Sequence, residues 1–231
     1  MPRFKSRHVP YSLKGAGGNA EFITCANSSS LNPTSAVTLE AWIKPESYKT
    51  SVLFDNSESG ATYSYFSMLN NTGGLSFYAT IGGAAKSVTN TATKVNMFEW
   101  NFINVTYTGS SILFFLNGSQ LAETLAASGA LGTNTGQLRI GRYVSLSGNL
   151  TFDGRISRPR VYSRAFTLAD HQARYYNNTD TTTMRSGLVL DLGFTEGSGT
   201  SLADGSGNGN TGTLSGASWS TDTRFKSRTA L

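Results

Sequence analysis

Apolar and polar residues alternate along much of the chain with a period of two. The stretch AVTLEAWIK at residues 36–44 has Val, Leu, Ala and Ile at every second position, with Thr, Glu, Trp and Lys between them. This period places one set of side chains on each face of a β-strand. Similar runs that predict strands cover residues 62–69, 74–80, 100–108, 111–117, 137–142, 152–162 and 187–194.

The segments between these runs favour tight turns. NNTGG, TGS, NGSQ and GTNTG are rich in Asn and Gly, which tolerate the positive φ that hairpins require. The pattern therefore predicts an all-β, antiparallel two-sheet sandwich. Pro159 lies inside one run and cannot donate a backbone hydrogen bond, so its strand is expected at a sheet edge or to carry a bulge.

One short helix is predicted near residues 167–176. Thr167 precedes LADHQARYYN and Asp170 follows three residues later, which is the spacing of a capping box.

Length and composition fit a single domain over residues 1–231. The chain has 25 Gly and 38% hydrophobic residues, enough for a core, and only 14% charged residues. Its one cysteine, Cys25, cannot form an intrachain disulfide and is expected to be a small buried strand residue. The N-terminal residues include no hydrophobic segment, and no apolar run reaches the roughly 18 residues of a membrane span. We therefore expect no signal peptide and no membrane insertion.

The net charge of +5 is concentrated near the two ends. Seven basic residues there are candidates for contacts with an assembly or an acidic partner, although solvated ends explain them as well: Arg3, Lys5, Arg7, Lys14, Arg224, Lys226 and Arg228. No zinc-ligand cluster or helix-turn-helix pattern accompanies them, so sequence-specific nucleic-acid binding is not expected.

Four segments in order over residues 30–175 carry a family resemblance. SLNPTSAVTLEAWIKP, FEWNFINVTYTGSSILFFLNGSQLA, GQLRIGR and FDGRISRPRVYSRAFTLAD resemble the concanavalin A-like lectin and glucanase superfamily, in its laminin G-like jelly-roll branch. The resemblance implies a jelly roll of two antiparallel sheets with a short helix near the end of the core segment.

The pentapeptide RFKSR occurs twice, at residues 3–7 and 224–228. In members of this branch, a segment resembling residues 187–219 usually precedes the core and is followed by an RF stretch. Here that segment lies at the other end, and both RFKSR copies occupy the junction. Residues 186–231 are therefore expected to complete the sandwich of their own chain or that of a neighbouring copy.

Catalytic patterns are missing from the sequence. Glycoside cleavage needs two suitably placed carboxylates, and the closest pair, Asp55 and Glu58, is interpreted as solvated loop acids. His8 and His171 have no Ser-Asp context, and Cys25 has no nucleophile motif. We therefore expect no enzymatic activity.

The family resemblance implies calcium on the sandwich rim, and the candidate ligands are Asp153, Asp204 and Asn208. Asn19, Ser157 and Arg158 depart from the family pattern. The ADGSGNGN segment fits either a calcium loop or a simple Gly/Asn turn.

Candidate ligand-binding residues are Tyr63, Tyr65 and Tyr143, together with Arg155. The tyrosines are expected near loop ends, where an exposed ring can stack on a sugar, and packing in the core or on the surface is the favoured alternative for each of them. Other residues favour plainer interpretations. The series of arginines at 155, 158, 160 and 164 fits an acidic ligand or a solvated edge, and five aromatics are expected in the core: Trp42, Trp100, Phe102, Phe114 and Phe115.

These patterns lead to three functional hypotheses. The first is a non-catalytic, surface-displayed binding or adhesion protein for a glycan or a surface protein. The second is a structural component of a homo-oligomer or larger assembly, such as a virion decoration protein. A glycoside-active enzyme is the weakest of the three. The first two are compatible, and we expect a binding protein that is carried on a virus particle or another external assembly.

Overall fold

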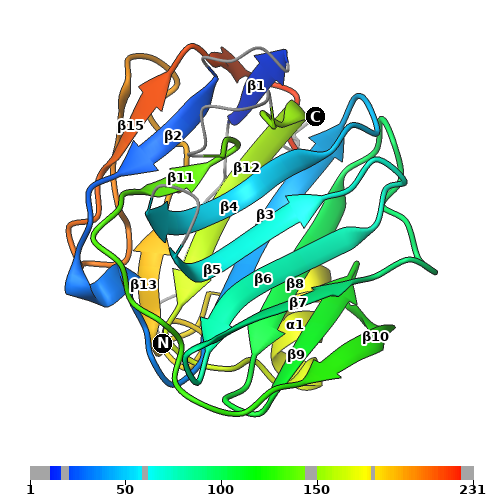
Figure 1. Ribbon diagram of the computed structural model, residues 1–231. Helices are drawn as coiled ribbons and strands as arrows, with labels where there is room; N and C mark the ends of the chain where they lie inside the picture. The colour runs from blue at the N-terminus through cyan, green and yellow to red at the C-terminus, as the bar shows by residue number, and fades with distance from the viewer. Residues whose placement is uncertain (1–10, 17–20, 59–61, 144–149, 178–179, 225–231) are drawn as a thin grey trace.

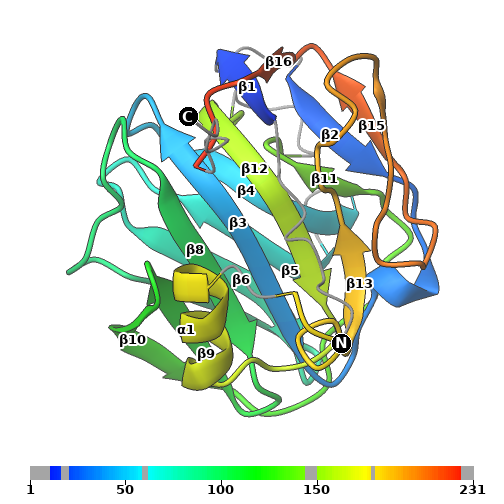
Figure 2. The same ribbon diagram turned by 180° about the vertical axis from the view of Figure 1, so that it is seen from behind.

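A computed structural model describes residues 11–16, 21–58, 62–143, 150–177 and 180–224 of the 231-residue chain. The described residues form two antiparallel sheets of eight strands each, with one α-helix (Figures 1 and 2). The jelly-roll sandwich that the sequence predicts is confirmed. No helix in the described part of the chain is long and apolar enough to cross a membrane.

We call the two sheets A and B. Sheet A has the order β10, β9, β8, β3, β12, β1, β16, with β13 paired to β12. Its strands are β1 (Ser12–Ala16), β3 (Val37–Pro45), β8 (Asn101–Tyr107), β9 (Ser111–Leu116), β10 (Ser119–Ala126), β12 (Asp153–Tyr162), β13 (Leu188–Asp191) and β16 (Ser218–Ser220).

Sheet B has the order β14, β15, β2, β11, β4, β5, β6, β7. Its strands are β2 (Phe22–Cys25), β4 (Ser51–Glu58), β5 (Thr62–Leu69), β6 (Leu75–Ile81), β7 (Ala84–Thr89), β11 (Leu138–Ile140), β14 (Ser201–Leu202) and β15 (Gly212–Ser215). A short 3₁₀ turn, η1 (Ser29–Leu31), follows β2.

The core lies between the sheets and is built by the predicted alternation. In β3 the residues Val37, Leu39, Ala41 and Ile43 all belong to the core cluster. The residues between them point to the outer face of sheet A. Cys25 is also buried in the core, as expected, and burial raises the pKa of its thiol to about 12.

The helix α1 (Leu168–Asn177) packs on the outer face of sheet A, over β8 and β9 (Figure 2). Its capping box is confirmed: the Asp170 N–H donates to Thr167 Oγ1 at 3.2 Å, and the Thr167 N–H donates to Asp170 Oδ2 at 2.9 Å. Its buried residues are His171 and Arg174.

Pro159 lies in a bulge, and the alternative position at a sheet edge is wrong. β12 pairs with β3, β1 and β13, and its register with β3 shifts between Ser157 and Arg160. Arg158 has a φ of +48°, in the left-handed region, which is how the chain accommodates a residue without an N–H inside the sheet.

The described part of the C-terminal segment, residues 186–224, pairs with the rest of the chain in both sheets. β13 pairs with β12, β15 pairs with β2, and β16 pairs with β1. The core side chains that this segment supplies are Val189, Leu190, Leu192, Phe194, Leu202 and Leu214. Exchange of the segment with a neighbouring copy stays a prediction.

Candidate functional site

The outer face of sheet B carries a row of polar and aromatic residues that the strand register aligns. Arg139 in β11 is opposite Asp55 in β4, Asp55 is opposite Phe66 in β5, and Phe66 is opposite Tyr78 in β6. The neighbouring row, which includes Ile140, belongs to the core. Because side chains alternate between faces, the Arg139 row points away from the core.

Four aromatic rings form a cluster in this row. Phe66 is at its centre, with ring centroids 5.7 Å from Tyr63, 5.6 Å from Tyr78 and 5.2 Å from Tyr143, all edge to face. The hydroxyl groups of Tyr63 and Tyr143 are 3.0 Å apart. The structure thus brings together two of the three tyrosines that the sequence indicated, although they are 80 positions apart. The sheet B patch comprises Asp55, Tyr63, Phe66, Tyr78, Arg139 and Tyr143.

The patch has a buried anion beneath a partly exposed surface. Asp55 is fully buried and accepts a hydrogen bond of 2.5 Å from Ser57 Oγ, whereas Arg139 and the three tyrosines are half-buried. Burial lowers the pKa of Arg139, and the charge of Asp55 opposes this shift. Arg139 Nη1 also donates to the Gln137 carbonyl at 3.1 Å. The tyrosine rings and the Arg139 guanidinium are therefore the accessible groups of the patch, whereas the Asp55 carboxylate is buried.

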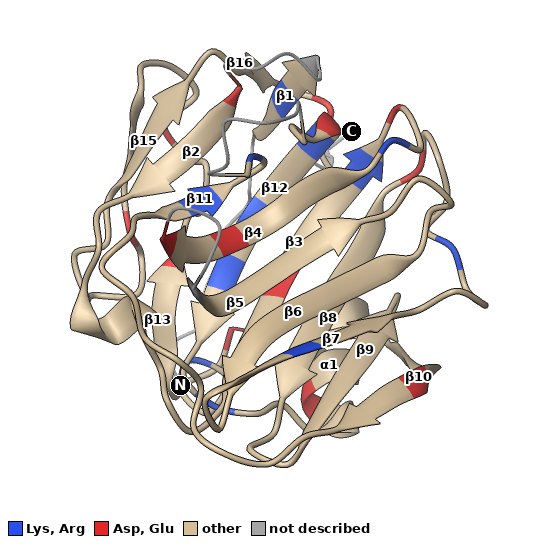
Figure 3. Cartoon of the chain, in the orientation of Figure 1, with Lys and Arg blue, Asp and Glu red and all other residues tan. Residues whose placement is uncertain are grey.

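The hydroxyl groups of Tyr63 and Tyr143 can each donate and accept a hydrogen bond. Burial raises the pKa of Tyr143, and the hydrogen bond with Tyr63 and the charge of Asp55 raise it further. Strands β5 and β6, which carry three of the four rings, contain no charged residue, as Figure 3 shows. The patch therefore combines apolar ring surface with a few polar groups, which is the general composition of small-molecule binding surfaces.

Two expectations about this region are wrong. Tyr65 does not lie at an exposed loop end: it is fully buried in the core, and its hydroxyl donates to the Leu31 carbonyl at 3.1 Å. Asp55 is not a solvated loop acid, because residues 51–58 form strand β4 and bury its side chain. Glu58, at the end of that strand, is exposed and accepts a hydrogen bond from Thr135.

Arg155 does not belong to the sheet B patch. It lies in β12 of sheet A, where it forms ion pairs with Glu46 and with Asp222, the latter at 3.4 Å. Arg155 and the tyrosines therefore lie on different sheets, and a ligand at Arg155 stays a prediction.

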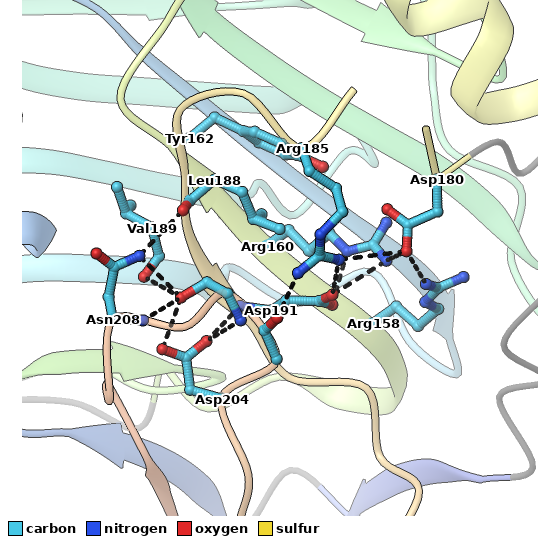
Figure 4. A network of polar contacts seen from close by, with 12 residues as sticks. Arg158, Arg160, Tyr162, Asp180, Arg185, Leu188, Val189, Asp191, Asp204 and Asn208 are labelled. Atoms are coloured by element: carbon cyan, nitrogen blue, oxygen red, sulfur yellow. Dashed lines mark hydrogen bonds and ion pairs between the residues drawn. The ribbon is translucent and has the colours of Figure 1, made fainter. Parts of the chain in front are cut away.

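Arg158 and Arg160 are not solvated either, because they take part in a buried ion network on the outer face of sheet A (Figure 4). Arg160 Nε is 2.7 Å from Asp191 Oδ1, and Arg160 Nη1 is 3.1 Å from Glu40 Oε1. Arg174 of α1 also pairs with Glu40, at 2.7 Å. The network joins β3, β12, β13 and α1, and it has the character of a structural contact between elements.

The three candidate calcium ligands do not form one site. Asp153 starts β12 and accepts a hydrogen bond of 2.7 Å from Ser47 Oγ. Asp204 accepts a hydrogen bond from the N–H of Asp191, and Asp191 is opposite Arg160 in β12. Arg160 comes seven residues after Asp153 in the same strand, which corresponds to roughly 23 Å at 3.3 Å per residue. Asp204 is therefore far from Asp153.

Asp204 and Asn208 belong to a turn that satisfies its own polar groups. The Asp204 carboxylate accepts the backbone N–H groups of Asp191, Ser206 and Asn210 at 2.9–3.0 Å, and the Ser206 hydroxyl at 2.7 Å. Asn208 Nδ2 donates to the Leu188 carbonyl at 3.1 Å. These contacts support the interpretation of ADGSGNGN as a Gly/Asn turn.

Two of the seven basic residues near the ends are within the described part of the chain. Lys14 pairs with Glu46 at 3.5 Å, and the guanidinium of Arg224 lies 4.8 Å above the centre of the Trp42 ring. Arg3, Lys5, Arg7, Lys226 and Arg228 lie outside the described residues.

The five strand aromatics occupy different places. Only Phe114 belongs to the core between the sheets. Trp42, Phe102 and Phe115 are buried on the outer face of sheet A, where rings of α1 cover them, as the 3.6 Å ring-centroid distance between Phe115 and His171 shows. Trp100 is half-buried and donates to Asp222. Their expected burial is confirmed for Trp42, Phe102, Phe114 and Phe115, whereas Trp100 is only half-buried.

Sequence reasoning missed Asp55, Phe66, Tyr78 and Arg139 as members of the patch. Phe66, Tyr78 and Arg139 lie in predicted strands, but the sequence does not indicate which residues are their neighbours. Asp55 gave no signal, because the sequence predicts no strand over residues 51–58. Only the pairing of β11, β4, β5 and β6 brings them into one row.

A family model for the concanavalin A-like lectin/glucanase superfamily matches residues 17–170. A search of curated protein sequences found no match. Among solved structures, a putative carbohydrate-binding protein from Bacteroides ovatus ATCC 8483 aligns with a TM-score of 0.68 and 19% identity. The alignment covers 94% of this chain and 61% of the Bacteroides protein, so the chain spans about three fifths of that neighbour.

Two further solved structures share the fold. The CBM40 domain of the Ruminococcus gnavus IT-sialidase, bound to α2,3-sialyllactose, aligns with a TM-score of 0.53 and 16% identity over 72% of this chain and 98% of the domain. A heptameric SAP-like pentraxin from Limulus polyphemus aligns with a TM-score of 0.51 and 15% identity over 85% of this chain and 95% of the pentraxin.

Proposed function

The chain belongs to the concanavalin A-like lectin/glucanase superfamily, and from this premise we propose that it is a non-catalytic binding protein whose sheet B patch holds a carbohydrate. The observation that carries the proposal is the convergence of Tyr63, Tyr78 and Tyr143 around Phe66, beside Arg139. Two of the structural neighbours are described as carbohydrate-binding, which agrees with this choice of ligand class.

The physical basis is the match between the patch and a sugar ring. A pyranose presents C–H groups on its faces and hydroxyl groups at its edge. Half-exposed tyrosine rings offer apolar surface for the faces, and the tyrosine hydroxyls and the Arg139 guanidinium offer hydrogen bonds to the edge. The buried Asp55 acts as a positioning residue, because its charge favours the ionised Arg139.

A glycan array, run with and without calcium, tests whether the protein binds carbohydrate. For a glycan that binds, titration calorimetry with Tyr78→Ala is expected to show an affinity about tenfold lower, because stacking surface worth roughly 1 kcal/mol or more is lost. The matched control is Tyr176→Ala, which removes a ring that is 69% exposed on α1, on the other sheet. Its affinity should equal that of the wild type.

Two results would contradict the proposal. Silence of the folded protein across the array would exclude the carbohydrate ligand, and an unchanged affinity of Tyr78→Ala would exclude the sheet B patch. Display on a virion or another external assembly, oligomerisation and a purely structural role stay predictions from the sequence.

A further inference from the structure

The basic side of the sheet B patch has hydrogen-bond donors that the described protein groups do not use. Arg139 Nη1 donates to the Gln137 carbonyl at 3.1 Å and reaches the Ser57 carbonyl at 3.5 Å. The Nε and Nη2 atoms of Arg139 have no hydrogen-bond partner in the described part of the chain. Because the side chain is half-buried and these two atoms are not enclosed, an incoming group can reach them. One edge of the guanidinium is therefore available to a ligand.

A second guanidinium lies on the same face of the sheet. Arg142 comes three residues after Arg139, and its guanidinium lies over the ring of Phe22, 4.6 Å from the ring centre. Ile23, the next residue in β2, belongs to the core, so Phe22 points to the outer face of sheet B. A regular strand would turn Arg142 towards the core, but Gly141 has a φ of +88° and breaks the alternation.

The two cations are neighbours beside the aromatic cluster. Thr24 is opposite Arg139, and Phe22 is two residues from Thr24 in β2, roughly 7 Å at 3.3 Å per residue. Burial and, after it, the nearby charge of Arg142 lower the pKa of Arg139. Tyr143, whose ring packs on the cluster, directly follows Arg142 in the chain. The rings and both guanidinium groups therefore form one continuous surface.

Neither cation has an ion-pair partner among the residues that the structure describes. Asp55 acts on Arg139 through its charge, but its side chain is fully buried. Glu58 is exposed and accepts a hydrogen bond from Thr135. The accessible part of the patch thus has two positive side chains that repel each other, and an anionic group between them would relieve that repulsion.

We infer that the sugar held by the sheet B patch is acidic, and that Arg139 and Arg142 bind its carboxylate or sulfate group. A guanidinium can donate two parallel N–H bonds to either group, and Nε and Nη2 of Arg139 are the pair left for this. Arg142 adds a second positive charge. The inference rests on the proposed carbohydrate binding and adds the charge class of the ligand.

Glycans that differ in a single acidic group test the inference. The array pairs each uronic acid with its carboxyl-reduced hexose and each sulfated sugar with the unsulfated one, and the pair that binds most tightly is titrated by calorimetry. In about 50 mM NaCl, the charged member should bind about tenfold more tightly than the neutral member. This ratio should fall in about 500 mM NaCl, where the Debye length is about 4 Å. The kind of pair that shows the preference identifies the group as carboxylate or sulfate.

Three variants assign the preference to the two arginines. Arg139→Gln should lower the affinity for the charged member about tenfold and Arg142→Gln about threefold, with a much smaller change for the neutral member. Arg139→Lys keeps the charge but loses the two parallel donors, so its affinity for the charged member should lie between those of the wild type and Arg139→Gln. If Arg139→Gln does not fold, as judged by circular dichroism, Arg142→Gln decides.

The matched control is Lys86→Gln, which removes one positive charge from the same sheet. Lys86 of β7 is exposed and is opposite Ala79, a core residue, so its side chain leaves the sheet on the other face. Its affinity for both members should equal that of the wild type.

The possible failures are distinguishable. Equal affinity for the charged and the neutral member, both lowered by Tyr78→Ala, would overturn this inference and leave the proposed carbohydrate binding intact. A preference for the charged member that survives in Arg139→Gln and in Arg142→Gln would also overturn it, because another cation would then bind the acidic group. Silence of the folded protein towards every pair would overturn both proposals.

Discussion

At the scale of single residues, burial rather than residue type decides which side chains can act. Tyr63 and Tyr65 are two positions apart in one strand. Tyr65 is fully buried in the core, whereas Tyr63 belongs to the sheet B patch. They differ because β5 has one extra residue, Ser64, at a bulge: Asn56 of β4 is opposite Tyr65, and the next residue, Ser57, is opposite Tyr63. A list of tyrosines near predicted loops cannot make this distinction.

His171 shows how burial affects stability. Its ring is fully buried, stacked on Phe115, and 3.3 Å from Thr106 Oγ1. Burial lowers the pKa of His171 from 6.5 to about 3. Below pH 6.5 the unfolded chain therefore binds a proton that the folded protein excludes, so this contribution to stability is lost as the pH falls towards 3.

We predict a pH-dependent difference between the wild type and His171→Gln. Between pH 7 and pH 5, the free energy of unfolding of the wild type should fall by about 2 kcal/mol relative to that of the variant, because the loss is about 1.36 kcal/mol for each pH unit below 6.5. Urea unfolding at both pH values measures this, and taking the difference cancels the other titrating groups. A difference that does not change with pH would show that folding does not lower the pKa of His171.

At the scale of secondary-structure elements, the buried ion network ties α1 and the C-terminal strand β13 to sheet A. Arg160 is fully buried and faces Glu40 of β3 on one side and Asp191 of β13 on the other. The bulge at Ser157–Arg160 interrupts the regular register of β12 with β3 next to these contacts. Sequence alternation predicted the strand, but it could not predict that its arginines are buried, because the covering elements are distant in sequence.

Arg160→Met tests this role. Removal of the guanidinium leaves two buried carboxylates without one of their cations, so the free energy of unfolding should fall by about 3–5 kcal/mol. Arg155→Met is the matched control in the same strand, since its partners Glu46 and Asp222 are partly exposed. Its loss should be about 1 kcal/mol or less. Equal losses in urea unfolding would contradict a special role of the network.

At the scale of the whole molecule, the C-terminal segment is part of both sheets. β15 extends sheet B next to β2, while β13 and β16 belong to sheet A, so residues 188–220 contribute to both sheets of the sandwich. Their core side chains, such as Leu190 and Phe194, fill the interior between the sheets.

Deletion of residues 186–231 is therefore expected to abolish cooperative folding, because it exposes strand edges and removes core side chains. Circular dichroism and size-exclusion chromatography of the purified chain measure this. Deletion of residues 225–231 alone is the control and should leave the fold intact, since every strand remains. A soluble, folded and monomeric 1–185 fragment would show that the segment is an appendage.

The sequence by itself determined eight of the sixteen strands in the described part of the chain, the helix with its cap, the jelly-roll class and the residues of β3 that face the core. These features follow from period-two alternation and from capping chemistry, which act between near neighbours in the chain. Only the tertiary structure decided that Asp55 is buried, that Tyr65 is inaccessible, and that Arg139, Phe66 and Tyr78 share a row with it. Those outcomes depend on which strands pair and in what register, and that choice is made by packing between segments far apart in the sequence.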